Sequence, residues 1–123
     1  MKVIVDTHTL IWFLFASGKL SEKARESIFD AKIIFIPTIV LLEGIYVSRK
    51  LRFESDFKEF ISKLPSPIFR ALSLDLDTVH SYIDLEHDLE IHDRIIVSSA
   101  KLLDVPIITK DKSISKIYPK VIW

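Results

Sequence analysis

Four acidic residues are the part of this sequence best suited to chemistry: Asp6, Glu43, Asp93 and Asp111. Two carboxylates about 4 Å apart repel each other by roughly 4 kcal/mol at an effective dielectric near 20. A cluster of them therefore needs a cation or a raised pKa. Because the chain has no cysteine, an all-oxygen site for a hard ion such as Mg²⁺ or Mn²⁺ fits best. Such an ion lowers the pKa of a bound water and stabilises charge at a phosphodiester.

Two of these acids follow predicted strands. The apolar run at residues 3–5 predicts a buried strand that stops at Asp6. A second apolar run, at residues 105–109, ends just before Asp111. Asp6 and Thr7 are also good helix N-cap residues, so a strand-to-helix turn is expected there. Ligands bind at the carboxyl ends of the strands in an open parallel sheet, so both acids are expected at that edge.

The other two acids belong to predicted helices. Asp93 is expected to cap a helix over residues 94–103. Capping alone would explain Asp6 or Asp93 if each stood by itself. Glu43 discriminates best between capping and chemistry, because it lies in the middle of a helix predicted over residues 38–50 and has no capping role. Its simplest other interpretation is an exposed helix position.

The remaining patterns place these acids in a chain of alternating strands and helices. We expect further helices at residues 9–16, from residue 21, and at residues 55–64, 75–85 and 113–117; strands at residues 33–36, 68–74 and 121–122; and a polar loop at residues 86–92. Gly18 is expected at the C′ position of the first helix. This order predicts one α/β domain over residues 1–123, with a parallel sheet covered by helices on both faces.

Composition narrows the possible functions. The chain has 17 basic and 17 acidic residues, which argues against coating nucleic acid by bulk charge but permits a nuclease with a local site. It has two glycines, too few for a glycine-rich phosphate loop or a dinucleotide fingerprint. The apolar runs are too short to span a membrane, and the N-terminus lacks signal-peptide features. We therefore expect a cytoplasmic protein without membrane association.

Four sequence segments resemble the PIN domain family, and most closely the toxin ribonucleases of VapBC-type toxin–antitoxin pairs. They are VDTHTLIW, LLEG, IHDRIIVSSA and PIITKD, in this order and spacing. The resemblance covers nearly the whole chain, and HDRIIVSSA followed by ITKD is its most diagnostic part. The family's acids fall on Asp6, Glu43, Asp93 and Asp111, and all four are acidic here.

The resemblance implies an Mg²⁺- or Mn²⁺-dependent endoribonuclease with a five-stranded parallel sheet. Asp6, Glu43 and Asp93 would be metal ligands, directly or through water, and Asp111 would contribute to the same site. Water would attack the phosphorus of the RNA substrate without a covalent enzyme intermediate. Family members usually form homodimers and are inhibited by an antitoxin protein, so both partners are expected here.

Several residues near the acids have two open interpretations. Thr109 either forms a hydrogen bond near the acids or simply ends a strand. His8 either orients a carboxylate or contacts RNA, or makes a local hydrogen bond. The basic run at residues 49–52 and four lysines near the end of the sequence either contact RNA phosphates or are simply solvated, and solvation is the preferred interpretation; the lysines are Lys110, Lys112, Lys116 and Lys120. Trp12, Phe13 and Phe15 are expected in the core or at a dimer interface, not as surfaces on which bases stack.

The stretch EHDLEIH contains groups that resemble metal ligands in type but not in spacing. His87, Asp88 and His92 match no standard metal-site spacing, which favours an ordinary polar loop. Arg94, next to Asp93, either neutralises the acid cluster or has a structural role, and the structural role is the preferred interpretation.

Two other classes of function remain open. A signalling receiver domain would need an acceptor acid at the end of the third strand, where Asp75 lies, and an acid pair near the first strand. Asp6 has no acidic neighbour, since Thr7 and His8 follow it. The second alternative is a catalytically weak module that binds RNA or an antitoxin.

Overall fold

A parallel sheet forms the centre of the molecule. The computed structural model describes residues 1–85 and 88–123. Within these residues the strand order is β3-β2-β1-β4-β5, every pairing is parallel, and the strands are β1 (Lys2–Val5), β2 (Ile33–Pro37), β3 (Phe69–Leu72), β4 (Ile107–Ile108) and β5 (Val121–Ile122). The α/β fold with a five-stranded parallel sheet is therefore confirmed.

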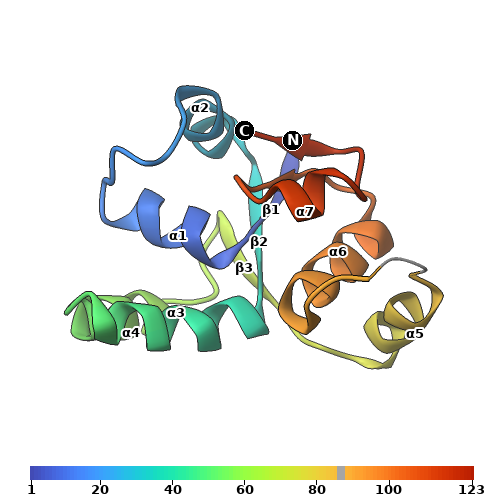
Figure 1. The fold of residues 1–123 in the computed structure, drawn as a ribbon. Coiled ribbons are helices and arrows are strands. Elements are labelled where there is room, and N and C mark those ends of the chain that lie inside the picture. The colour runs from blue at the N-terminus through green and yellow to red at the C-terminus, as the bar shows by residue number, and fades with distance from the viewer. Residues whose placement is uncertain (86–87) are drawn as a thin grey trace.

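Helices cover both faces of this sheet, as expected. Figure 1 shows α1, α3 and α4 on one side of the strands and α5 and α6 on the other. The helices in the described residues are α1 (Thr7–Leu14), α2 (Glu22–Asp30), α3 (Thr38–Lys50), α4 (Glu54–Ser62), α5 (Leu76–Asp84), α6 (Ile91–Leu103) and α7 (Lys112–Ser115). No described helix has the length and apolar character to span a membrane.

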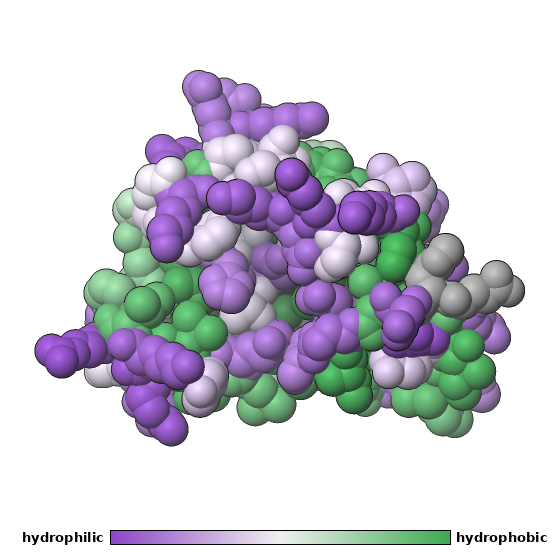
Figure 2. Space-filling view, in the orientation of Figure 1, coloured by the Kyte–Doolittle hydropathy of each residue, from purple (hydrophilic) through white to green (hydrophobic). Residues whose placement is uncertain are grey.

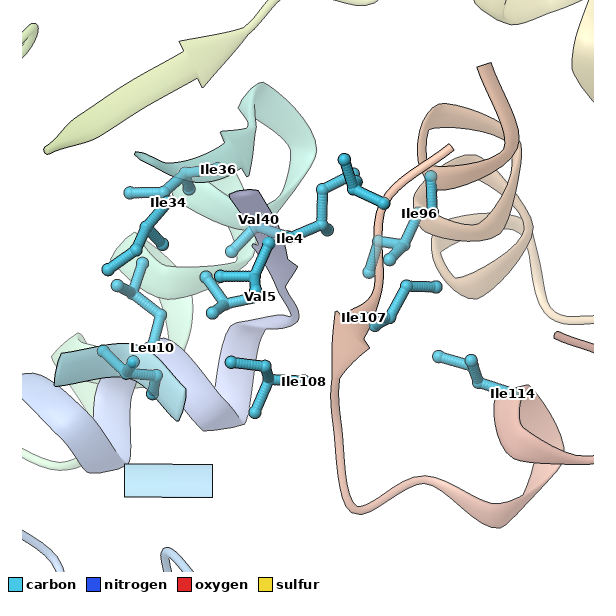
Figure 3. Close-up of a cluster of buried hydrophobic side chains, with 14 of the residues drawn as sticks. Ile4, Val5, Leu10, Ile34, Ile36, Val40, Ile96, Ile107, Ile108 and Ile114 are labelled. Atoms are coloured by element: carbon cyan, nitrogen blue, oxygen red, sulfur yellow. The ribbon is translucent and has the colours of Figure 1, made fainter. Parts of the chain in front are cut away.

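The core explains why β1 is the central strand. Val3, Ile4 and Val5 are at most 1% exposed, so both faces of β1 are covered. Figure 3 shows Ile4 and Val5 among the apolar side chains of the neighbouring strands, with Ile107 and Ile108 of β4 beside them. Burial of each such side chain contributes about 1.5–3 kcal/mol. This packing fixes the end of β1, and thereby the place where Asp6 leaves the sheet.

The first helix ends earlier than its sequence predicts, and Gly18 does not close it. Helix α1 stops at Leu14, and the left-handed residue after it is Ala16, with φ 51°. The Ser17 N–H donates to the Trp12 carbonyl at 2.9 Å. This bond satisfies a carbonyl of the last turn before the chain reaches the glycine, so the expected C′ glycine was wrong.

The loop expected at residues 86–92 ends two residues earlier, because α6 begins at Ile91. Residues 86 and 87 lie outside the described residues, which removes His87 from any structural account. Of the rest, residues 88–90 are non-helical, whereas Ile91 and His92 already belong to α6.

Candidate active site

The four acids line one cavity at the carboxyl ends of β1 and β4. Its volume is about 500 Å³, and its other lining residues are Thr7, His8, Trp12, Ile96, Lys110 and Lys112. Figure 2 shows hydrophilic side chains gathered at the hollow centre of this face, over the region between α1, α3 and α6. Acids that are distant in sequence are therefore brought together from separate strands and helices.

Asp6 is held by hydrogen bonds to both of its carboxylate oxygens. As N-cap of α1, it accepts the Thr9 N–H on Oδ1 at 3.0 Å, and its Oδ2 accepts the Thr109 hydroxyl. The Thr109 oxygen also accepts the Asp111 N–H at 3.0 Å, and this side chain is 1% exposed. One buried hydroxyl thus links the residues that follow β1 and β4.

Glu43 has a partner that the sequence did not indicate. The Thr7 hydroxyl donates to Glu43 Oε1 at 2.9 Å, and Thr7 is buried. Because Thr7 lies in the first turn of α1 and Glu43 lies on α3, this bond joins two helices. The position of Thr7 directly after Asp6 was the one sequence feature that placed its hydroxyl near the acids. The sequence alone favours only a helix-capping role for Thr7.

Asp93 does not cap its helix, which corrects the sequence prediction. Helix α6 begins at Ile91, and Glu90 is its N-cap. The Glu90 carboxylate accepts the N–H groups of His92 at 3.0 Å and Asp93 at 3.4 Å. Asp93 therefore lies in the first turn, where the helix dipole favours a negative charge and its side chain is free to face the cavity.

The carboxylates strongly influence each other's ionisation. Burial, followed by the charge of Asp111 and then those of Glu90 and Asp6, raises the pKa of Asp93 to about 7. Burial also opposes ionisation of Asp111, but hydrogen bonds from the Ser113 hydroxyl and N–H outweigh it and lower the pKa of Asp111. In the protein without metal, Asp93 therefore keeps its proton up to about pH 7, whereas Asp111 loses its proton more readily than an ordinary aspartate.

Replacing Asp93 with asparagine should stabilise the metal-free protein at high pH. The folded protein keeps the Asp93 proton up to about pH 7, whereas the unfolded chain ionises this group near pH 4. Rising pH therefore destabilises the fold between these values. In EDTA at pH 8 we expect Asp93→Asn to raise the free energy of unfolding by about 1–2 kcal/mol, discounted for partial exposure.

Urea unfolding at pH 8 and at pH 5 tests this expectation. Most of the advantage should disappear at pH 5, where wild-type Asp93 is neutral. Asp56→Asn on the exposed face of α4 is the matched control and should change little at either pH. An equal effect of Asp93→Asn at both pH values would contradict the electrostatic origin.

Thr109→Val should destabilise the fold because it removes both hydrogen bonds of the buried hydroxyl. The substitution leaves the Asp111 N–H and one Asp6 oxygen without this partner. The bond to the Asp6 carboxylate contributes about 1.5–3 kcal/mol and the bond from the neutral Asp111 N–H about 0.5–1.5 kcal/mol, so we expect a loss of about 2 kcal/mol or more in urea unfolding. Thr109→Ser keeps the hydroxyl and should retain most of the stability; equal losses in both variants would indicate packing instead.

Arg94, His92 and His8 were named from the sequence as residues near the acids. Their contacts lie outside the acid cluster or at its edge. The Arg94 guanidinium donates to the Tyr82 and Leu85 carbonyls and so joins α6 to the end of α5. His92 Nδ1 lies 2.5 Å from Glu90 Oε1 and 3.9 Å from Glu43 Oε2. His8 is exposed at the cavity.

Asp75 lies apart from the four acids. It caps α5, where its carboxylate accepts the Thr78 N–H at 3.0 Å and the Thr78 hydroxyl at 3.1 Å. It does not line the acid cavity.

The carboxylate oxygens of the four acids are suitable ligands for a hard cation. Their side chains do not form a complete coordination shell by themselves. In residues 1–85 and 88–123, no group of three or more His, Cys, Asp or Glu side chains is placed to hold a metal ion. Mg²⁺ usually takes one or two protein carboxylates and keeps several waters, so converging acids with bridging waters meet its requirements. Burial raises the pKa of Asp93 most, and the negative charge of the neighbouring acids raises it further.

The family model described as the PIN domain matches residues 3–119. Comparison with curated protein sequences finds no match.

Similar solved structures share the fold of this chain. A toxin–antitoxin complex from Klebsiella pneumoniae has 21% identity, a TM-score of 0.74, and coverage of 97% of this chain and 94% of that one. DNA-bound VapBC from Salmonella typhimurium has 19% identity, a TM-score of 0.72, and coverage of 98% and 95%. Mycobacterium tuberculosis VapC20, described as a sarcin–ricin loop cleaving toxin, has 12% identity, a TM-score of 0.74, and 93% coverage of both chains.

Proposed function

This chain belongs to the PIN domain family, and on that premise we propose that it is a metal-dependent endoribonuclease, the toxin of a toxin–antitoxin pair. The observation that carries the proposal is the convergence of Asp6, Glu43, Asp93 and Asp111 in one cavity. A structurally similar protein, VapC20, is described as a toxin that cleaves the sarcin–ricin loop. The proposed reaction is hydrolysis of an RNA phosphodiester bond.

The proposed cofactor is Mg²⁺ or Mn²⁺, held by the four acids directly or through water. Asp6 and Asp93 are the best candidates for direct contact, since they leave the ends of β1 and the first turn of α6 towards the cavity. When bound, such an ion supplies an activated water and stabilises negative charge at the phosphate.

The chain's own residues orient the ligands and bind the substrate backbone. The buried residues Thr109 and Thr7 orient Asp6 and Glu43 through hydrogen bonds to their carboxylates. Such supporting bonds commonly matter 10- to 100-fold for metal affinity or activity. Lys110 and Lys112 line the same cavity and offer cationic contacts to RNA phosphates.

Calorimetric titration of Mn²⁺ tests the metal part of the proposal. Wild type should bind Mn²⁺, and Glu43→Gln should bind it about 10-fold or more weakly because one carboxylate is lost. Glu59→Gln, on exposed α4, is the matched control. If wild type has no measurable affinity with or without RNA, the metal-dependent mechanism is wrong.

One alternative keeps a specific observation in its favour. This alternative is a module that binds RNA or an antitoxin but does not cleave RNA at a useful rate. It is favoured because, among the described residues, no three acidic, histidine or cysteine side chains are placed to hold an ion. The receiver alternative has lost its support, because Asp75 caps α5 outside the acid cavity.

An antitoxin protein is the proposed partner. One similar structure is a toxin–antitoxin complex, and the family resemblance points the same way. Co-purification with the product of a short neighbouring reading frame tests this partner. The homodimer and the cytoplasmic location stay predictions from the sequence, and light scattering on the purified chain tests the first.

A further inference from the structure

An aromatic group at the acid cavity has no role in the proposed hydrolysis. Trp12, expected from the sequence in the core or at a dimer interface, is half-buried and lines the cavity. Its ring centroid lies 5.6 Å from that of His8 and 5.9 Å from that of Trp123. The Lys19 ammonium lies 6.0 Å from the Trp12 centroid. A large aromatic surface is thus held in place beside four carboxylates.

The charge distribution makes such a surface useful to a nuclease. The chain has no net charge, and four carboxylates line this cavity, so without a bound cation its field repels phosphates rather than attracting them. Two lysines, Lys110 and Lys112, line the same cavity. Substrate affinity must therefore come from local contacts, and stacking of a base on an aromatic ring is one that needs no positive charge.

We infer that Trp12, supported by His8 and Trp123, is the surface on which a nucleobase next to the scissile phosphate stacks. This inference rests on the proposed function. A base reaches such a ring only when it is unpaired and unstacked from its neighbours, so the substrate class is single-stranded RNA or an RNA loop. Every base has a π face, so stacking on Trp12 gives affinity with little sequence selection.

Tryptophan fluorescence measures this contact directly, because the chain has two tryptophans. In Asp93→Asn/Trp123→Phe protein, Trp12 is the sole tryptophan and RNA turnover is removed. We expect a single-stranded RNA hexamer with Mg²⁺ to quench its fluorescence, whereas an abasic hexamer of equal length and charge should not. In Asp93→Asn/Trp12→Phe protein, the remaining Trp123 should respond much less, since it does not line the cavity.

Binding of labelled hexamers by anisotropy gives the matched affinity test. In the Asp93→Asn background, Trp12→Leu should weaken binding of the RNA hexamer about 10- to 100-fold and leave the abasic hexamer unchanged. Trp12→Phe keeps a ring and should lose less. Thermal unfolding of each variant confirms that the fold is retained, and Trp12→Phe keeps the test valid if Trp12→Leu unfolds.

The outcomes separate this inference from the proposed function. Equal quenching or equal affinity for the two hexamers overturns the inference, and so does undiminished RNA binding by Trp12→Leu. If wild type cleaves RNA but base-dependent quenching is absent, the inference alone is wrong. If base-dependent quenching occurs without cleavage, stacking stands and the proposed hydrolysis is wrong. If Trp12→Leu no longer co-purifies with the antitoxin but still binds the RNA hexamer as tightly as its parent, the inference is overturned. Trp12 would then be a contact for the protein partner.

Discussion

Asp6→Asn is expected to reduce RNA cleavage about 100- to 1,000-fold while the protein stays folded. Asparagine caps a helix as well as aspartate does, so the bond from the Thr9 N–H to this side chain should survive. What disappears is one negative charge at the end of β1, where the proposed ion would bind. Losses of this size are typical when one group that stabilises developing charge is removed.

The control for this experiment comes from the fold itself. Asp75 caps α5 as Asp6 caps α1, and its carboxylate accepts the Thr78 N–H at the same distance, 3.0 Å. Asp75→Asn should therefore change capping equally but leave cleavage intact, because Asp75 lies outside the acid cavity. Cleavage should also stop in EDTA and return with Mg²⁺ or Mn²⁺.

A contaminating nuclease would cleave RNA in every preparation. The wild type and the variants Asp6→Asn, Asp75→Asn and Asp93→Asn must therefore be purified identically. Cleavage of a defined RNA is followed on denaturing gels. Cleavage retained by both Asp6→Asn and Asp93→Asn in nuclease-free preparations would show that the proposed mechanism is wrong.

The fold was predictable because the strands and helices have strong, separate patterns. Helix α3 spans the predicted residues, Thr38–Lys50, and β5 spans the predicted Val121–Ile122. The strand at residues 3–5 was evident from three consecutive apolar residues, and all three are buried. These features depend on periodicity and burial, which a sequence displays locally.

The details around the acids depend on side-chain contacts between distant segments, which no local pattern displays. Thr7 donates to Glu43 across two helices, so its role appears only when α1 and α3 are packed. Glu90 begins α6 because its own carboxylate reaches two N–H groups. Glutamate is not among the preferred N-cap residues, so the sequence favoured Asp93, which lies in the first turn instead.

The packing behind Glu43 leads to the second large effect. The next residue, Gly44, faces the ring of Phe57 on α4, and Phe57 is fully buried. A Cβ at position 44 would lie 2.3 Å from Phe57 Cζ. A phenylalanine ring has few rotamers and is enclosed by the core, so it cannot move aside without displacing α3 from α4. The glycine is therefore needed for a close approach of two helices.

Gly44→Ala is expected to destabilise the protein by about 1–2 kcal/mol in urea unfolding. Overpacking a core costs about 1–3 kcal/mol, and the better helix propensity of alanine offsets up to about 1 kcal/mol of that cost. In a Phe57→Leu background the clash with the ring is absent, so the same substitution should be neutral or stabilising. The double-mutant cycle should therefore give a coupling of about 1–3 kcal/mol. Additivity within about 0.5 kcal/mol would show that Phe57 does not limit position 44.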